Sequence, residues 1–484
     1  MSDPNLENSS DMSGRKIFEL ISSAAADGSA ARLGKLSFPG KKVVETPNFF
    51  AVTSRGAIPH LTPDNLKRHT SVNGVYMALE DFIEKKEPPI QHTPGGEGSR
   101  RLHRFTALPS NTFSVLGPRR CPAITTPFGN TPKALAVFTS TGFRNVTVPE
   151  FATYVRSLQP DIVLPMADLP HTSATPSSKK LVRMVERTEV WLDEFLGKLA
   201  SSKPTDSLDS SVFAPVLPVE YPIQWDYLRH LSEDVFGKLD GLAVYDANLL
   251  PDLVNYPPLA PLPKLCMDPP KTPQEVLRQI SLGIDICTLS FANITSDAGV
   301  AMTFTFPSPS VDEVRPLGIN MWSPEHNTAV VPLVEGCQCY TCAKHHRAYL
   351  HHLLNAKEML GWNLLQIHNH HIVNEFFVGI RQALAEGQAV FEEEARRFIA
   401  SYEPVFPEGT GERPRARGYH FKSEADADRI NKPAWKDLEK GTASAQITNL
   451  AESGTPSGES QDATPVEVVN VEEAVATLSI NQHE

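Results

Sequence analysis

Three cysteines crowd into six consecutive positions of this 484-residue chain: Cys337, Cys339 and Cys342. Thiolates are the ligands that Zn²⁺ favours in closed tetrahedral sites, so this spacing predicts that the surrounding chain folds about a metal ion. The six cysteines of the whole chain are too few for a disulfide scaffold, which favours a reducing compartment. The remaining three are expected to be buried as small apolar side chains: Cys121, Cys266 and Cys287.

A tetrahedral site with three sulfur ligands needs one ligand more, and histidines follow the cysteines closely. His345 or His346 would close the chelate within the helical turn that holds Cys342, whereas a later histidine would tie a second helix to the cysteines. The residues alone leave the fourth ligand open among several candidates: His345, His346, His351, His352, His368, His370 and His371.

Short apolar runs bounded by turn residues predict buried β-strands along much of the chain. These runs are Lys42–Val44, Asp161–Met166, Gly241–Val244 and Val330–Val334. Helical patterns lie between several of them: Pro149–Ser157, Leu181–Ala200 and Thr272–Leu282, the last opening with Thr272 and Glu275 as a capping box. Alternating strands and helices predict an α/β barrel or an open doubly wound sheet, and composition does not choose between them.

Helical spacing dominates the part of the chain that follows the cysteines. A run from Tyr349 to Leu360 predicts a first helix, which we expect Gly361 to end. Two more helices follow, one around Ile372–Leu384 and one over about Ala389–Ser401. Turn-forming residues mark two further segments as exposed loops: His92–Arg101 and His171–Lys180.

The net charge of −12 argues against a protein that coats nucleic acid indiscriminately, so any RNA contact is expected to be local. No run of about 18 apolar residues predicts a membrane span, and the polar, acidic N-terminus does not resemble a secretion signal. We therefore expect a cytoplasmic protein without an integral membrane segment. Peripheral association with the mitochondrial outer surface is compatible with that expectation.

The segment CQCYTCAKHHRAYLHHLLNAKEMLGWNLLQIHN resembles the zinc segment of the tRNA-guanine transglycosylases. In that family C-x-C-x-x-C is followed by R-A-Y-x-H-H and then by H-N, whose histidine is the fourth zinc ligand. Counted from Cys342 in the family's spacing, that histidine is His368, followed by Asn369. The resemblance thus implies that one Zn²⁺ is bound by Cys337, Cys339, Cys342 and His368.

The resemblance covers roughly residues 18–400 and is weak between about 85 and 145. Other segments that carry it are Ala31–Leu36, Val44–Phe49, Glu186–Thr188 with Trp191-Leu192, and Gly241–Val244. It implies a (β/α)₈ TIM-type barrel over 15–335 and a zinc-binding helical subdomain over 336–405 that completes the barrel. An extension over 406–440 would follow. The polar N-terminus, 1–14, and the acidic tail, 441–484, are expected to be disordered.

The family's catalytic residues are altered in this chain. The segment that carries the nucleophilic aspartate aligns with Gly283–Ser290, and Thr288 stands at the nucleophile position. Asp285 is three residues away, so on a strand its side chain is expected to point to the opposite face. A threonine hydroxyl would need an adjacent base to act as the nucleophile, and the sequence offers no evident one.

Three further positions depart from the catalytic pattern. The aspartate that recognises the base falls on Ala167, with Asp168 one place late, and the G-L-A-V-G motif ends in Tyr245. The D-S-G-G-F-Q segment, which carries the other catalytic aspartate, has no counterpart between Pro122 and Arg144. Joint loss of these groups predicts a chain with no catalytic residues.

This combination, together with Leu289–Phe304, resembles the accessory branch of the family. Such a subunit forms a heterodimer with a catalytic queuine tRNA-ribosyltransferase subunit, which exchanges guanine for queuine at the wobble position (34) of tRNAs with GUN anticodons. By position the resemblance implies Tyr349 and His352 as partner contacts.

Contact with tRNA is expected through the complex, with phosphate candidates at Lys344, Arg347 and Arg381. Two alternatives stay open. One is an active transglycosylase with an atypical nucleophile, and the other is a zinc-dependent interaction protein derived from the family.

Overall fold

The computed structural model describes residues 17–22, 30–85, 87–94, 100–124, 129–139, 141–169, 176–200, 210–309 and 313–412. The chain divides into two compact units, Met1–Asn431 and Lys432–Glu484, and every described residue belongs to the first. The two segments expected to be disordered, 1–14 and 441–484, lie outside the described residues. None of the described helices is long and apolar enough to cross a lipid bilayer.

Eight parallel strands close into a barrel in the order β10-β11-β12-β13-β4-β5-β6-β9, which confirms the expected α/β barrel. Closure comes from β13 pairing with β4, where Thr288 lies opposite Phe50. The strands are β4 (Asn48–Val52), β5 (Gly74–Ala78), β6 (Phe113–Gly117), β9 (Ile162–Val163), β10 (Ser211–Val216), β11 (Gly241–Val244), β12 (Lys264–Cys266) and β13 (Ile286–Leu289).

Side chains that alternate along these strands build two cores. One set, including Phe50, Val115, Phe213 and Ile286, packs inside the barrel. The other set packs outward against helices. These helices are α1 (Pro63–His69), α2 (Arg101–Thr106), α3 (Val148–Leu158), α4 (Ser178–Ala200), α5 (Tyr221–Glu233), α6 (Pro273–Ser281) and α7 (Phe291–Asp297).

Capping residues explain where two of the predicted helices begin. The Oγ1 of Thr147 accepts from the amide of Glu150 at the start of α3, and that of Thr272 accepts from Glu275 at the start of α6. The Glu275 carboxylate accepts from the amide of Lys271, one residue before the partner that a capping box requires. Short 3₁₀ turns link other elements: Leu79–Asp81, Pro89–His92, Phe236–Lys238, Ala247–Asn255, Pro257–Leu259 and Pro324–His326.

Three small antiparallel sheets lie outside the barrel. They are β1 (Phe18–Ser22), β2 (Leu33–Leu36) and β3 (Val44–Thr46); the hairpin β7 (Ala134–Thr139) and β8 (Gly142–Thr147); and the ribbon β14 (Val300–Met302) and β15 (Gly318–Asn320). Phe18, Leu36 and Val44 of the first sheet belong to the core inside the barrel. That sheet therefore closes the end of the barrel where the strands begin.

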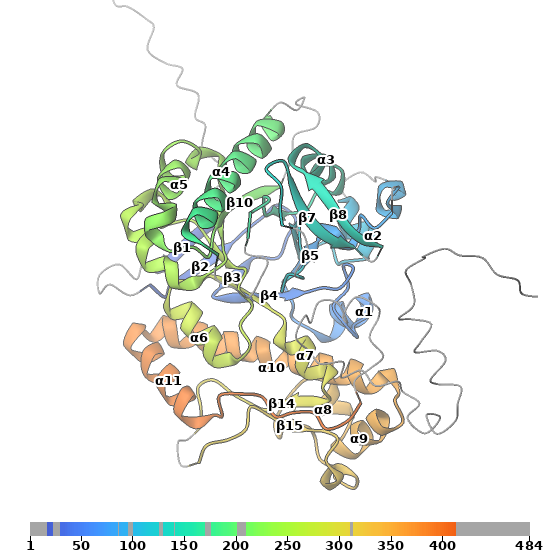
Figure 1. The fold of residues 1–484 in the computed structure, drawn as a ribbon. Helices are drawn as coiled ribbons and strands as arrows, with labels where there is room; N and C mark the ends of the chain where they lie inside the picture. Colours follow the sequence, from blue (N-terminus) through green and yellow to red (C-terminus); the bar gives the residue numbers. More distant parts are fainter. Residues whose placement is uncertain are drawn as a thin grey trace, which may run out of the picture. The chain divides into compact units, whose positions relative to one another are not determined.

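The C-terminal helices are α8 (Tyr340–Lys344), α9 (Arg347–Asn355), α10 (Met359–Glu386) and α11 (Gln388–Ser401). In Figure 1, α10 runs beneath α6 and α7, and it contacts α7 closely. The prediction that Gly361 ends a helix was wrong, because Gly361 lies in the first turn of α10. A Cβ there would lie 3.2 Å from side-chain atoms of Leu353 and Leu354, so this glycine lets α9 and α10 approach each other.

One predicted strand was also wrong, and two others overlap the observed strands only in part. Val330–Val334 forms no strand, and Val330 is 75% exposed. Its backbone bonds to α9 instead, since the carbonyl oxygen of Val331 accepts from the amide of Arg347. Of Lys42–Val44 only Val44 is in a strand, and β9 covers two residues of Asp161–Met166.

Candidate metal centre and barrel mouth

The three clustered cysteines lie in a tight turn that leads into α8. Gly336 adopts a φ of 77°, which glycine tolerates without strain, and the chain turns there just before Cys337. Cys339 caps α8, and its Sγ accepts from the amide of Cys342 at 3.3 Å. The turn thus points three sulfur atoms to the same side.

His368 in the middle of α10 faces these three sulfur atoms. Its Nδ1 lies 3.8 Å from the Sγ of Cys337 and 3.4 Å from the Sγ of both Cys339 and Cys342. A tetrahedral Zn²⁺ with bonds of about 2.3 Å to sulfur and about 2.0 Å to nitrogen would separate such atoms by about 3.5 Å. The four ligand atoms all lie within 4.8 Å of one another, so their chemistry and spacing fit a zinc ion.

Two hydrogen bonds set the orientation of the His368 ring. Nε2–H donates to the carbonyl oxygen of Met302 at 2.9 Å, which leaves the Nδ1 lone pair facing the sulfur atoms. The next residue, Asn369, accepts from the amide of Met302 and donates to the carbonyl oxygen of Val300. Metal ligation would therefore join the cysteine turn, α10 and the ribbon β14–β15.

Contacts within the cluster shift the pKa values of two of its members. Contacts with the thiols of Cys339 and Cys342 lower the pKa of Cys337. Burial lowers the pKa of His368, but contacts with Cys337 and Cys342 outweigh burial and raise it to about 9. His368 is fully buried, and Cys339 is 4% exposed. A closed site of this kind suits a structural ion rather than a catalytic one.

Most of the other candidate histidines have different roles. His346 caps α9, and the Nδ1–H of buried His370 donates to the carbonyl oxygen of Gln366. His351 bonds to the carbonyl oxygen of Met321, and His371 contacts Cys337 from beside the cluster. Among the residues that the structure describes, His368 is the only histidine grouped with the three cysteines.

The barrel mouth, where the carboxyl ends of the strands meet, holds the altered positions. Thr288 is fully buried, and its hydroxyl donates to the Sδ of Met267 at 3.6 Å. Asp285 precedes β13 at the opposite end of the barrel, where Arg32 binds both of its carboxylate oxygens at 2.9 and 2.6 Å. The carboxylate nearest in sequence to Thr288 is therefore already paired and cannot serve it as a base.

Asp168, one place after Ala167, is buried and does not line the mouth cavity. Its carboxylate accepts from Asn130 at 2.6 Å and from Arg187 of α4 at 2.5 Å. Burial raises the pKa of Asp168, and these partners oppose that rise. Ala167 lines the mouth in its place and offers no polar group.

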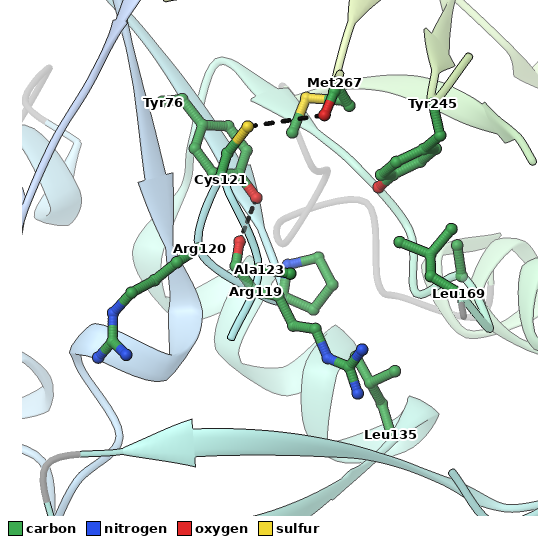
Figure 2. Close-up of a pocket in the computed structure, with 11 residues that line it drawn as sticks. Tyr76, Arg119, Arg120, Cys121, Ala123, Leu135, Leu169, Tyr245 and Met267 are labelled. Atoms are coloured by element: carbon green, nitrogen blue, oxygen red, sulfur yellow. Dashed lines mark hydrogen bonds between the residues drawn. The ribbon is translucent and has the colours of Figure 1, made fainter. Parts of the chain in front are cut away.

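A cavity of about 80 Å³ remains at the mouth. Figure 2 shows Tyr245 and Leu169 facing Tyr76 and Cys121 across it, with the Tyr76 hydroxyl bonded to the carbonyl oxygen of Arg119. An engineered cavity of about 150 Å³ holds benzene, so this smaller space could not enclose a two-ring base. Among the residues that the structure describes, the lining includes no carboxylate: Tyr76, Pro118, Arg119, Arg120, Cys121, Ala123, Leu135, Ala167, Leu169, Tyr245 and Met267.

The hairpin β7–β8 covers the mouth and occupies the window in which the D-S-G-G-F-Q segment was sought. That window, 122–144, contains no acidic residue. The Arg119 Nε donates to the carbonyl oxygen of Ala136, and the amide of Phe138 donates to the buried carboxylate of Glu80. Residue types alone did not predict this cover, because its anchors, Arg119 and Glu80, come from two separate segments of the chain.

The two expected partner contacts lie on α9. Tyr349 is half-buried, and its ring stacks on His345 with 5.2 Å between centroids and 20° between planes. His352 is exposed one turn further along. Beside them, the ring of His69 from α1 lies 4.2 Å from that of Tyr340. Imidazole and phenol rings from α1, α8 and α9 thus line one part of the surface.

Two of the three expected phosphate contacts, Arg347 and Arg381, donate hydrogen bonds within the fold, and contact of all three with tRNA stays a prediction. Arg347 donates to the carbonyl oxygens of Pro332 and Leu333 at 3.0 and 2.8 Å. Arg381 donates to the carbonyl oxygen of Pro47 at 2.9 Å. Lys344 alone is exposed.

Known proteins resemble this chain over nearly all of the part that the structure describes. A family model described as queuine tRNA-ribosyltransferase matches residues 27–404. A relative from Schizosaccharomyces pombe named queuine tRNA-ribosyltransferase accessory subunit 2 is 34% identical over 438 residues, which cover 88% of this chain and 94% of the relative. A relative with the same name from Xenopus laevis is 28% identical, and the match covers 74% of this chain and 95% of the relative. Another from Drosophila melanogaster is 29% identical, and the match covers 74% of this chain and 87% of the relative. The matched region includes both the barrel and the cysteine cluster.

Proposed function

This chain belongs to the queuine tRNA-ribosyltransferase family, and from that premise we propose that it is the non-catalytic accessory subunit of such an enzyme. In this role it pairs with a catalytic subunit that exchanges guanine for queuine at the wobble position of tRNA. The names of its relatives support the assignment to an accessory subunit. The absence of catalysis by this chain is our own inference from the barrel mouth.

One observation carries this inference: the Thr288 hydroxyl at the nucleophile position meets a thioether rather than a base. Base exchange at a ribose carbon needs a nucleophile and a group that moves protons to and from the bases. The cavity beside Thr288 is lined without a carboxylate and is covered by β7. An active enzyme that uses Thr288 as an atypical nucleophile is therefore disfavoured.

The metal centre has a structural role in this proposal. We infer that Zn²⁺ binds Cys337, Cys339, Cys342 and His368 and holds α8, α10 and β14 together. When bound, the ion would contribute folding free energy by joining these elements, and none of its four ligands lines the mouth cavity.

The surface on α9 would then serve assembly. Tyrosine is enriched at energetically important interface positions, and Tyr349 is held in place by its stack on His345. We infer that Tyr349 and His352 contact the catalytic subunit, and that tRNA binds through the assembled heterodimer. A cytoplasmic location stays a prediction.

A single experiment separates this proposal from its alternatives. The purified chain, the catalytic subunit and their mixture are each assayed for exchange of labelled guanine in tRNA. We expect no exchange by the chain alone and full exchange only in the mixture. Exchange by the chain alone that Thr288→Ala abolishes would establish an active enzyme. No complex and no gain of activity in the mixture would instead favour a zinc-dependent interaction protein.

A further inference from the structure

The segment 403–412, here called the strap, leaves α11 and returns across the ribbon β14–β15. At its start, the Gln274 side chain of α6 donates to the carbonyl oxygen of Glu403 at 2.8 Å. At its end, Glu412 pairs with Lys357 in the turn between α9 and α10 at 2.9 Å. The strap thus joins a barrel helix to the turn that precedes the metal-bearing helix α10.

Two glycines let the middle of the strap pack closely against the surface beneath it. A Cβ at Gly409 would lie 1.8 Å from the carbonyl oxygen of Ala298, and a Cβ at Gly411 would lie 1.9 Å from the ring of Trp322. Neither glycine has a positive φ, so other residues could adopt these backbone conformations. Glycine is therefore required here for space, because the strap touches the surface beneath it directly.

That surface is the outer side of the structure that orients His368. Asn320 of β15 donates to the hydroxyl of Thr410 in the strap at 3.0 Å. Asn320 pairs in register with Val300 of β14, and Met302 at the other end of β14 accepts the Nε2 hydrogen of His368. A continuous series of contacts runs from the strap through the ribbon to the metal centre.

We propose that the strap is a brace for the metal centre, and that its contacts with Trp322 and Asn320 hold the Met302 carbonyl in the position that orients His368. The residues of the strap are positioning residues, since none of them touches the cysteine cluster. The outer partners of metal-binding histidines typically change metal affinity 10–100-fold when they are lost. Loosening the strap should therefore weaken metal binding while the barrel stays folded.

Full-length variants test the brace with Co²⁺ as the probe, because thiolate-bound Co²⁺ absorbs visible light. The purified chain is stripped with a chelator, and its Co²⁺ dissociation constant is measured by titration. Gly411→Ala is compared with Gly197→Ala, since a Cβ at Gly197 meets nothing within 4 Å. We expect Gly411→Ala to raise the dissociation constant about tenfold and Gly197→Ala to leave it unchanged.

Two further variants separate bracing from general loss of stability. Thr410→Val removes the bond to Asn320 at an exposed position, so it should fold even if Gly411→Ala does not, and it should also weaken Co²⁺ binding. Phe151→Leu loosens the packing of α3 on Phe195, far from the strap in the chain, and should lower the melting temperature without changing Co²⁺ affinity.

Equal affinity for Co²⁺ in Gly411→Ala, Thr410→Val and the unaltered chain would overturn the brace. So would an equal loss of affinity in Phe151→Leu. Failure of the unaltered chain to bind Co²⁺ would overturn the metal centre itself and the brace with it. None of these readouts depends on tRNA or on a partner subunit.

Discussion

His368 donates its Nε2 hydrogen to the carbonyl oxygen of Met302 at 2.9 Å, and this bond connects the metal centre to the ribbon that follows the last barrel strand. Because Nε2 is occupied as a donor, Nδ1 is left as the metal-binding atom. Residues 66 apart in the chain are thereby coupled by one hydrogen bond. The metal centre is thus a junction between the barrel and the helices that follow it.

Replacing Cys339 with serine should abolish stoichiometric zinc and lower the melting temperature by several degrees. Structural zinc contributes folding free energy directly, and the serine hydroxyl is a poor ligand at neutral pH. Elemental analysis and thermal unfolding check this prediction. Cys287→Ser, at a buried cysteine on β13, is the control and should keep its zinc. Undiminished zinc in Cys339→Ser would refute the ligand assignment.

Replacing Thr288 with valine should leave base exchange by the heterodimer within about twofold of the unaltered rate. Valine has nearly the same shape, and the lost contact is a weak bond to the Met267 sulfur. Steady-state exchange with the catalytic subunit present is the measurement. A rate loss of a hundredfold or more would mean that the hydroxyl takes part in catalysis.

Replacing Tyr349 with alanine should weaken the heterodimer about 10- to 100-fold, because anchor residues at interfaces contribute about 1.4 to 2.8 kcal/mol. Titration calorimetry or analytical ultracentrifugation gives the affinity. Trp225→Ala on α5 removes a 48% exposed aromatic ring elsewhere and should leave the affinity unchanged. Equal affinities of the two variants for the catalytic subunit would show that Tyr349 is not an interface residue.

The buried amine of Lys264 should make the free energy of unfolding depend on pH. Burial, followed by repulsion from Arg32, lowers its pKa to about 7, whereas an unfolded lysine has a pKa of about 10.4. Between these values the unfolded chain binds a proton that the folded chain lacks. The free energy of unfolding should therefore rise with pH from about 7 to about 10, and fall as the pH returns toward 7.

Urea unfolding at pH 7, 8 and 9 measures this dependence. Lys264→Met should reduce the slope by about 1 kcal/mol per pH unit, close to the limit for one proton. Lys42→Met, at an exposed lysine, should leave the slope as in the unaltered chain. An unchanged slope in Lys264→Met would show that this amine stays protonated in the folded protein.

Local chemistry in the sequence was enough to predict α/β architecture and the cysteine cluster, whereas the choice of a barrel over an open sheet came from the family resemblance. Alternating apolar runs and helices such as Leu181–Ala200 indicate α/β architecture, because burial and helix capping act over a few neighbouring residues. The same local rules failed at Gly361 and Val330–Val334. There, contacts with distant helices outweigh the preferences of the segment itself.

The sequence by itself therefore determined three thiols in one turn and alternating strands and helices, and its resemblance to the family added the barrel and Thr288 at the nucleophile position. The residues alone left the fourth ligand open and the family spacing implied His368; the tertiary structure places its ring against the sulfur atoms, and only there does Asp168 pair with Asn130 and Arg187. The reason is physical. A side chain's partners depend on atoms that approach within a few ångströms across tens or hundreds of residues, and the local pattern does not encode that approach.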